Sequence, residues 1–348
     1  MEKMERVIES IGLLDQEMME KAQVRLDSLT KPKGSLGKLE DIAKQVAGIT
    51  GELMPSFPKK AVVVMAGDHG VCAEGVSPCP QEVTYQMIRN FLNGGAAISV
   101  LSRHVNADLV CVDVGIDADV HYPGLHLRKV RKGTRNMAKE PAMTREEAVH
   151  AITVGIDMVD ELYSKGYGAF AIGEMGIGNT TPSSALLAVL AGVDVEDAVG
   201  IGSGTDSEML ARKKRVIQQA IQVNQPDPQD PLDVLAKVGG LEIAGMAGVI
   251  LGSAASRCPV VIDGFIASAA ALVAARLAPR SVDFMIGSHQ SMEKGHALLL
   301  EAIGLSPMLQ MDMRLGEGTG AVLVFPMIDA AGKVMREMET YESAGVSR

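Results

Sequence analysis

The hydrophobic and polar positions along the chain predict strands and helices in alternation. Five short runs of mainly β-branched and other apolar residues each end in glycine and a polar side chain, and they lie within 60–71, 107–117, 167–179, 258–265 and 283–291. Short continuous apolar runs are typical of parallel strands that are buried on both faces. Segments with helical spacing separate these runs, at 81–104, 145–166, 181–192 and 207–223. The alternation therefore predicts an α/β fold with an open, mostly parallel sheet and helices on both faces.

Helical periodicity also marks the two ends of the chain. Residues 1–50 have the pattern of helix, basic loop and helix, because proline and glycine interrupt the periodicity at 31–37. The closing segments, roughly 292–304 and 325–343, have helical spacing as well. We therefore expect two domains. A large α/β substrate-binding domain would span 26–300, and a small helical domain would be built from 1–25 and 301–348.

Composition and charge limit the kinds of partner. The 348 residues are 47% hydrophobic and carry a formal net charge of −10. No nucleic-acid partner is expected, because binding a phosphate backbone needs clustered Lys and Arg. No run approaches the ~20 apolar residues of a membrane span, since even 268–278 is interrupted by Arg276. The charged N-terminus lacks a signal-peptide core and the 4 cysteines form no CxxC pair, so we expect a cytoplasmic protein.

The Gly-rich polar loops that follow the strands are the first candidates for a site. Ligands of open parallel sheets bind beyond the carboxyl ends of the strands, so these loops are expected to line one crevice. At 173–186, glycines that let the backbone approach an anion precede a helix start, with Thr181 as the predicted N-cap. The residues proposed here for phosphate binding are Gly176, Gly178, Asn179 and Thr180. A purely structural turn is the alternative, because neither a GK[ST] nor a GxGxxG motif is present.

Further loops offer additional phosphate and ribose ligands. The segment 200–214 contains Gly202, Ser203 and Gly204 ahead of a helix that carries Lys213. Lys213 faces either a bound phosphate or solvent. Asp263 follows an apolar run and is placed either to accept from ribose hydroxyls or to cap the next helix. Ser291 lies in a third loop of this kind.

Two histidines invite other chemistry. His289 has no GxSxG elbow beside it, which disfavours a hydrolase. Asp68 and His69 form the most metal-like pair, yet no HxxxH or HExxH spacing supplies a second ligand. We expect no metal and assign this pair a structural or substrate-lining role.

Glu317 is the candidate base. It lies between glycines in the segment MRLGEGTGA at 313–321, just ahead of an apolar run. Glycines on both sides allow a rigid carboxylate close to a ligand, and burial would raise its pKa toward that of a useful base. A solvent-exposed turn glutamate is the alternative for this segment taken alone.

Nine ordered blocks of sequence resemble one family. They are KPKGSLGKLE (31–40), AGDHGV (66–71), VDVGID (112–117), GEMGIGNTTPSSA (173–185), VNQPDP (223–228), KVGGLEIAGMAGVILG (237–252), DGFIASAAAL (263–272), SHQSMEKG (288–295) and MRLGEGTGA (313–321). Together they resemble the nicotinate-nucleotide–dimethylbenzimidazole phosphoribosyltransferase family over nearly the full chain. The resemblance implies transfer of phosphoribose from nicotinate mononucleotide to 5,6-dimethylbenzimidazole, which makes the lower-ligand nucleotide of cobalamin.

The same resemblance implies the roles of particular residues. Glu317 falls on the catalytic base and Glu174 on a second carboxylate, while Lys213 and the glycine loops fall where the family holds the phosphate. It also implies a Rossmann-like large domain, a small helical domain from both termini and a homodimer, and it implies no cofactor. The residues expected around the azole base are Cys79, Gln86, Met87 and Leu315.

The sequence leaves alternatives open for the acceptor base and for the class of function. Near the expected azole pocket, 77–87 places Cys79 and Met87 where relatives have polar side chains, so another azole, a purine or a phenolic base is the alternative acceptor. A module that senses pyridine nucleotides without turnover is a second class of function. An NAD-dependent oxidoreductase is a third, disfavoured because GxGxxG is absent.

Overall fold

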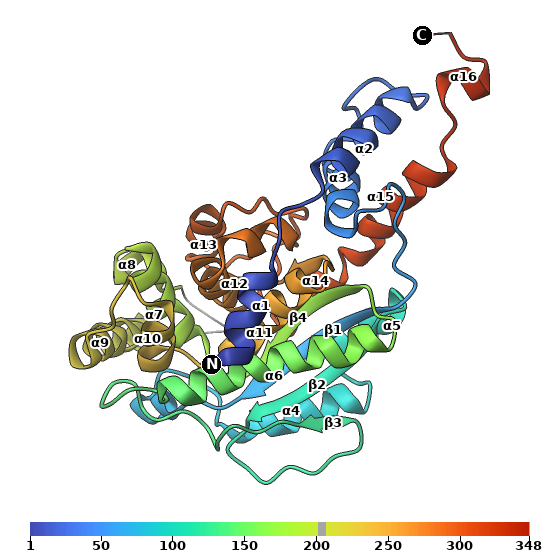
Figure 1. Ribbon diagram of the computed structural model, residues 1–348. Coiled ribbons are helices and arrows are strands. Elements are labelled where there is room, and N and C mark those ends of the chain that lie inside the picture. Colours follow the sequence, from blue (N-terminus) through green and yellow to red (C-terminus); the bar gives the residue numbers. More distant parts are fainter. Residues whose placement is uncertain (201–206, 348) are drawn as a thin grey trace.

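Six parallel strands form the central sheet of the protein. The computed structural model describes residues 1–200 and 207–347. The strands are β1 (Lys60–Gly67), β2 (Asp108–Gly115), β3 (Leu125–Leu127), β4 (Ala169–Met175), β5 (Val260–Ile262) and β6 (Met285–Gly287). They run in the order β3-β2-β1-β4-β5-β6, and every neighbouring pair is parallel (Figure 1). The predicted α/β fold is therefore confirmed. The short edge strand β3 was not predicted.

Strand β1 shows why both faces of the sheet are covered. All of its residues are buried, and side chains alternate between the two faces. Ala61, Val63 and Met65 belong to one hydrophobic cluster, whereas Val62 and Val64 belong to the other. A strand that is apolar in both directions needs a layer of helices on each side.

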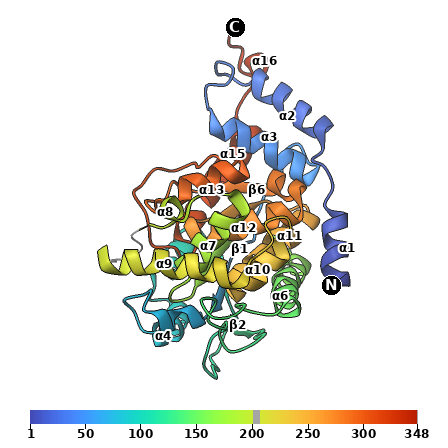
Figure 2. The same cartoon turned by 90° about the vertical axis from the view of Figure 1, so that its left-hand side faces the viewer.

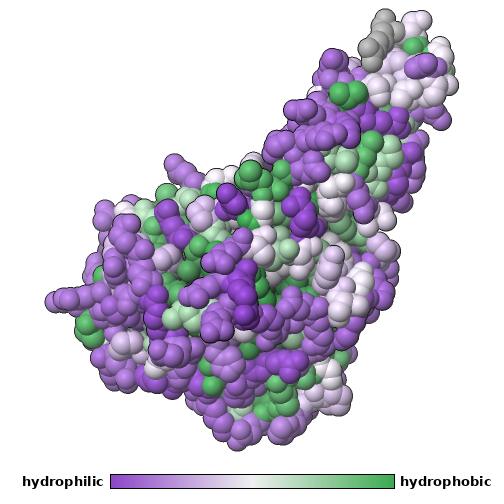
Figure 3. Space-filling view, in the orientation of Figure 1, coloured by the Kyte–Doolittle hydropathy of each residue, from purple (hydrophilic) through white to green (hydrophobic). Residues whose placement is uncertain are grey.

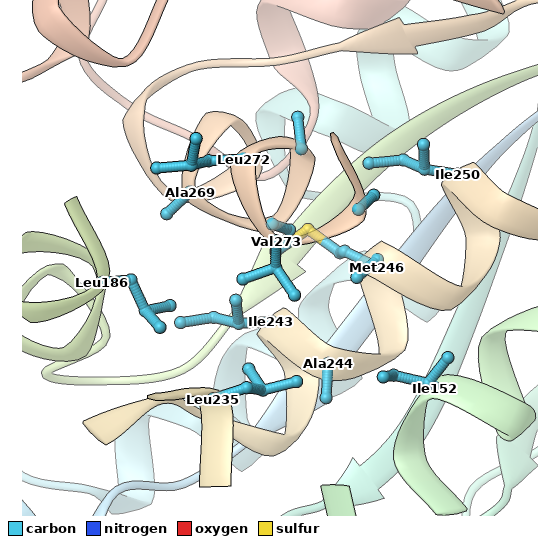
Figure 4. Close-up of a cluster of buried hydrophobic side chains, with 14 of the residues drawn as sticks. Ile152, Leu186, Leu235, Ile243, Ala244, Met246, Ile250, Ala269, Leu272 and Val273 are labelled. Carbon is cyan, nitrogen blue, oxygen red and sulfur yellow. The ribbon is translucent and has the colours of Figure 1, made fainter. Parts of the chain in front are cut away.

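The larger hydrophobic cluster lies under five helices on one face. These are α6 (Arg145–Ser164), α7 (Thr180–Ala191), α10 (Pro231–Val238), α11 (Leu241–Ala255) and α12 (Phe265–Leu277). Figure 4 shows how their side chains converge, with labelled residues that include Ile152, Leu186, Leu235, Ile243, Met246 and Val273. Helices α6 and α11 cross closely, because a Cβ at Gly155 would lie 2.0 Å from the carbonyl oxygen of Gly245. Only glycine permits that approach.

The second face carries shorter helices. They are α4 (Glu82–Leu92), α5 (Ala97–His104) and α14 (Thr319–Val322), which pack near β1, β2, β4 and β5. The segment 81–104 was predicted as one helix, but the structure divides it at 93–96. Gly94 takes a φ of +80° there, which ends α4 and lets the chain turn into α5.

Helices from both chain ends form a projection from the body. Helices α2 (Gln16–Ser28), α3 (Lys38–Thr50) and α15 (Phe325–Glu337) pack together and extend away from the sheet, with α16 (Tyr341–Ala344) at the tip (Figures 1 and 2). Helix α1 (Glu2–Ser10) instead packs against α6 and α11. We propose a small helical domain drawn from both termini. The predicted domain boundaries, between residues 25 and 26 and between residues 300 and 301, stay a prediction. Helix α3 packs with the projection rather than with the sheet.

The remaining elements connect these layers. They are the 3₁₀ segments η1 (Gly70–Glu74) and η2 (Pro279–Phe284) and the helices α8 (Val195–Ala198), α9 (Ser207–Asn224) and α13 (His296–Ile303). Hydrophilic side chains dominate the face shown in Figure 3, with scattered apolar patches. None of the helices in the described part of the chain combines the length and apolar character that crossing a membrane requires.

Candidate active site

A cavity of about 220 Å³ opens at the carboxyl edge of the sheet. Its walls come from the loops after β4, β5 and β6, from the segment before α4, and from the loop ahead of α14. The predicted residues that line it are Glu174, Gly176, Gly178, Asn179, Thr180, Lys213, Asp263, Ser291, Glu317, Cys79, Met87 and Leu315. The fold thus brings together segments from most of the chain at the edge where ligands of parallel sheets bind.

Glu317 is a buried carboxylate on a constrained backbone. Its side chain is only 7% exposed, and its φ of +63° lies in the left-handed region, between Gly316 and Gly318. A non-glycine residue there is held by its surroundings, at a cost of the order of 1–3 kcal/mol. Strand β4 passes directly beneath, since a Cβ at Gly173 would lie 2.3 Å from the carbonyl oxygen of Glu317. The solvent-exposed alternative for Glu317 is wrong in this structure.

The carboxylate of Glu317 points at the start of α5. The backbone N–H of Ile98 donates to its Oε2 at 3.4 Å. Burial raises the pKa of Glu317, the bond from Ile98 opposes that rise, and the charge of Asp263 adds to it. A carboxylate with a raised pKa is a stronger base than an ordinary one, which suits Glu317 to accept a proton.

Glu174 is the second carboxylate of the cavity, and it is hydrogen-bonded to the backbone of Glu317. Its Oε1 accepts the backbone N–H of Glu317 at 3.2 Å, and its Oε2 accepts from the Asn179 side-chain amide. Burial raises the pKa of Glu174 to about 7, against these two hydrogen bonds, and the charges of Glu242 and Asp263 raise it further. This group therefore changes charge within the neutral range.

Folding should depend on pH through Glu174. An unfolded glutamate has a pKa near 4.3, so between about pH 4.5 and 7 the unfolded chain releases this proton before the folded protein does. The folded state consequently loses stability as pH rises, by roughly 3–4 kcal/mol from this group. The variant Glu174→Gln has no such titration. We therefore expect its free energy of unfolding, relative to that of the unsubstituted protein, to be higher at pH 8 than at pH 5. Denaturant unfolding of both proteins at each pH measures the gap, and an equal gap at pH 5 and pH 8 would rule out the raised pKa.

Asp263 holds the Glu317 segment from the other side. Its Oδ2 accepts the N–H of Gly318 at 3.0 Å, and its Oδ1 accepts the N–H of Ala321 at 2.9 Å. His289 Nδ1 lies 3.9 Å from Oδ1, and its ring lies against Gly320, where a Cβ would approach Nδ1 to 2.0 Å. Asp263 therefore anchors the base-bearing loop. Contact with a ribose hydroxyl, proposed from the sequence, stays a proposal.

Lys213 brings a buried amine to the glycine-rich loop. It lies on α9, is 3% exposed, and its Nζ donates to Thr180 Oγ1 at 2.8 Å. Burial lowers its pKa, while the charge of Glu293 opposes that effect. The solvated alternative for Lys213 is therefore wrong. A buried ammonium beside a glycine-rich helix start is suited to a bound phosphate.

The helix start differs from the predicted one. Helix α7 begins at Thr180 with Asn179 as N-cap, and no side chain caps it. The Asn179 amide is used by Glu174 instead, and the predicted cap Thr181 is buried inside the first turn. The N–H groups of this turn are therefore left without a side-chain cap, which suits an anion.

The wall expected to hold the azole base is only partly as predicted. Cys79, Met87 and Leu315 line the cavity, but Gln86 is exposed on α4 and does not. Consecutive helical residues point about 100° apart, so a helix that presents Met87 to the cavity turns Gln86 away. The contact predicted for Gln86 is therefore not found. Arg314 also lines the cavity, and the sequence offered only its closeness to Glu317 as a signal.

Three other predicted residues cannot be placed. Gly202, Ser203 and Gly204 lie outside the described residues. Within 1–200 and 207–347, no group of three or more His, Cys, Asp or Glu side chains is arranged to hold a metal ion.

The cavity can perform proton transfer on a phosphorylated ligand. A buried amine is available for the phosphate. Two buried carboxylates are available for a proton and for developing positive charge, and one of them accepts the backbone N–H of the residue that bears the other. On the carboxyl edge of a parallel sheet, such a site is typical of α/β proteins that bind nucleotides. The family within that class follows from comparison with known proteins. The family model described as "Phosphoribosyltransferase" matches residues 11–346, and the chain belongs to this family.

Several individual proteins are similar to this chain over nearly its full length. A Geobacter sulfurreducens protein named nicotinate-nucleotide–dimethylbenzimidazole phosphoribosyltransferase is 54% identical over 335 residues, covering 96% of this chain and 95% of its own. A Chloroflexus aggregans protein of the same name is 54% identical over 343 residues, covering 98% and 97%. The crystal structure of CobT from Thermus thermophilus matches with a TM-score of 0.92 and 45% identity, over 95% of this chain and 99% of that one.

Proposed function

We propose that this enzyme transfers the phosphoribosyl group of nicotinate mononucleotide to 5,6-dimethylbenzimidazole. The products would be α-ribazole 5′-phosphate and nicotinate, for the lower-ligand nucleotide of cobalamin. The names of the full-length relatives support this assignment. The observation that carries it is the hydrogen bond from the backbone N–H of Glu317 to Glu174 Oε1 at 3.2 Å, which holds two buried glutamates together in a cavity that Lys213 also lines.

The reaction needs placement and a base more than acid help. The pyridinium of nicotinate mononucleotide carries a positive charge, so the glycosidic C–N electron pair returns to the ring as neutral pyridine leaves. One azole nitrogen attacks C1′ of the ribose, and the proton on the other azole nitrogen passes to Glu317. Attack from the side opposite the leaving group converts a β linkage into an α linkage.

Glu174 and the phosphate ligands have distinct roles in this proposal. Glu174 orients the azole or offsets positive charge at the ribosyl centre, since it is buried and shares its Oε1 with the Glu317 backbone. Lys213, Thr180 and the loop at 176–179 hold the phosphate. None of these steps uses a metal or a cofactor.

The cavity wall expected to contact the acceptor base is largely apolar. Met87 and Leu315 give the wall apolar surface that suits two methyl groups, and Cys79 adds a small side chain. A purine or phenolic base is the alternative acceptor. We expect a mixture of benzimidazoles, adenine and a phenol, offered with nicotinate mononucleotide, to give chiefly the dimethylbenzimidazole product by mass spectrometry. Preferred transfer to adenine or the phenol would replace this substrate assignment.

We also propose a cytoplasmic homodimer. The exposed apolar side chains of Leu13 and Val24, 65% and 70% exposed near and on α2, offer surface for a second copy. Cys72, Cys79, Cys111 and Cys258 are all free, which fits a reducing compartment.

A further inference from the structure

A buried ion pair lies directly behind the glycine-rich loop and takes no part in the chemistry proposed above. His69 follows β1, and Glu242 is in the first turn of α11. His69 Nε2 and Glu242 Oε1 are 2.7 Å apart, and their side chains are 1% and 0% exposed. The cavity lining includes neither residue, so neither touches a ligand there.

Three glycines from different segments enclose this pair. A Cβ at Gly176, in the loop after β4, would lie 2.4 Å from the carbonyl oxygen of Gly67, 3.2 Å from His69 Nε2 and 3.4 Å from Glu242 Oε1. A Cβ at Gly240 would lie 2.5 Å from His69 Cε1, and one at Gly67 would lie 3.2 Å from Glu242 Oε2. At Gly176 the backbone of the loop therefore packs against the backbone of Gly67 and against the ion pair, with no side chain between them.

The charges around the pair hold it in one arrangement. Burial opposes charge on His69, but Glu242 first, and then Asp68 and Glu174, raise its pKa. Glu242 also lies at the N-terminal end of α11, where a negative charge is favoured. Removing either partner would leave the other as an isolated buried charge, which is strongly destabilising. The pair is thus rigid only as long as both members are present.

The backbone of His69 is also tied to the segment ahead of α4. The side-chain amide of Gln81 donates to the carbonyl oxygen of His69 at 2.9 Å, immediately before α4. The ion pair therefore lies among the end of β1, the loop after β4 and the start of α11, while the backbone of His69 holds the segment ahead of α4.

We infer that His69 and Glu242 are positioning residues for the phosphate loop. Their contact with Gly176 fixes the position of the loop at 176–180 and thereby determines the affinity for nicotinate mononucleotide. The inference rests on the proposed function in one respect, that this loop binds the phosphate. It assigns the Asp68–His69 motif a role beneath the substrate site rather than in a metal centre.

Three variants test this inference: His69→Gln, Glu242→Gln and the two together. We expect each single variant to weaken nicotinate mononucleotide binding, measured by calorimetry, by about tenfold or more. The KM for dimethylbenzimidazole should change less than about twofold. The double variant should recover most of the lost affinity, because two glutamine side chains can hydrogen-bond to each other and no buried charge is left alone.

A matched control separates positioning from general stability. Lys60 lies on the same strand at the opposite end, is 6% exposed and pairs with Asp329 at 2.9 Å. Asp329 is 37% exposed, so Lys60→Met breaks a half-buried ion pair at the other end of the strand. It should lower stability and leave nicotinate mononucleotide affinity unchanged.

The outcomes are distinct. Single variants that keep nicotinate mononucleotide affinity within twofold, or that weaken both substrates alike, overturn the inference while the proposed function stands. If the single variants do not fold, the double variant and Gly240→Ala decide. The alanine Cβ displaces the pair sterically and should lower nucleotide affinity selectively, and unchanged affinity in Gly240→Ala overturns the inference. Failure of the unsubstituted protein to bind nicotinate mononucleotide would instead overturn the proposed function.

Discussion

Replacing Glu317 with glutamine is expected to lower kcat for phosphoribosyl transfer by about 10²–10³-fold, the size of effect that a general base contributes. Glutamine keeps the shape of the side chain, and its carbonyl oxygen can still accept from the Ile98 N–H, so the loop should stay in place. The KM for nicotinate mononucleotide should change less than threefold. Steady-state kinetics of nicotinate release, followed by chromatography, measure both quantities.

The dependence of kcat on pH provides a second test of Glu317 as the base. Only the carboxylate form of Glu317 accepts a proton, so kcat of the unsubstituted enzyme should rise with pH through the raised pKa of Glu317 and then level off. The glutamine variant should lack that rise. Glu317→Ala leaves space where formate can act as a base, so added formate should restore part of the activity. A glutamine variant with more than half of the original turnover would remove Glu317 from its role.

Replacing Lys213 with methionine is expected to raise the KM for nicotinate mononucleotide by about 10–100-fold, because a charge-assisted hydrogen bond to phosphate contributes about 1.5–3 kcal/mol. Methionine keeps most of the length of the buried chain and removes its charge. The kcat at saturating nucleotide should fall less than the KM rises. Initial rates against nucleotide concentration measure the split.

A substrate without the phosphate is the control for Lys213. Nicotinate riboside should react equally, though poorly, with the unsubstituted enzyme and with Lys213→Met. Arg212, the neighbour of Lys213 on α9, is more exposed and pairs with Glu208, so Arg212→Met should leave the nucleotide KM unchanged. An equal loss for riboside and nucleotide in Lys213→Met would place Lys213 away from the phosphate.

The strands β1, β2, β4, β5 and β6 were predictable because most of their residues are buried and apolar. The sequence could not show β3, since its three residues, Leu125–Leu127, are half-buried or exposed and form no continuous apolar run, whereas the equally short edge strand β6 is buried throughout. The break between α4 and α5 was missed because helical spacing continues across Gly94, and the positive φ of that glycine appears only in three dimensions.

The site was predictable as a set of loops, but the links between them were not. Local sequence marked Glu317 as rigid. Its burial and its partner Ile98 come from segments distant in the chain. Asp263 was assigned to the nucleotide, whereas its two hydrogen bonds from the Glu317 loop cross 55 and 58 positions of sequence. Gln86 and Met87 differ only in the direction that α4 gives them. Such facts depend on tertiary packing, which no local pattern encodes.

The most direct test of the account is one product analysis. The unsubstituted enzyme is incubated with equal amounts of nicotinate mononucleotide and dimethylbenzimidazole, and the products are identified by mass and by the proton NMR signal of the anomeric position. We predict one α-ribazole 5′-phosphate for each nicotinate released, and no release without the azole. Nicotinate formed together with ribose 5-phosphate, a β-linked product, or no nicotinate at all would contradict base-assisted transfer at this site.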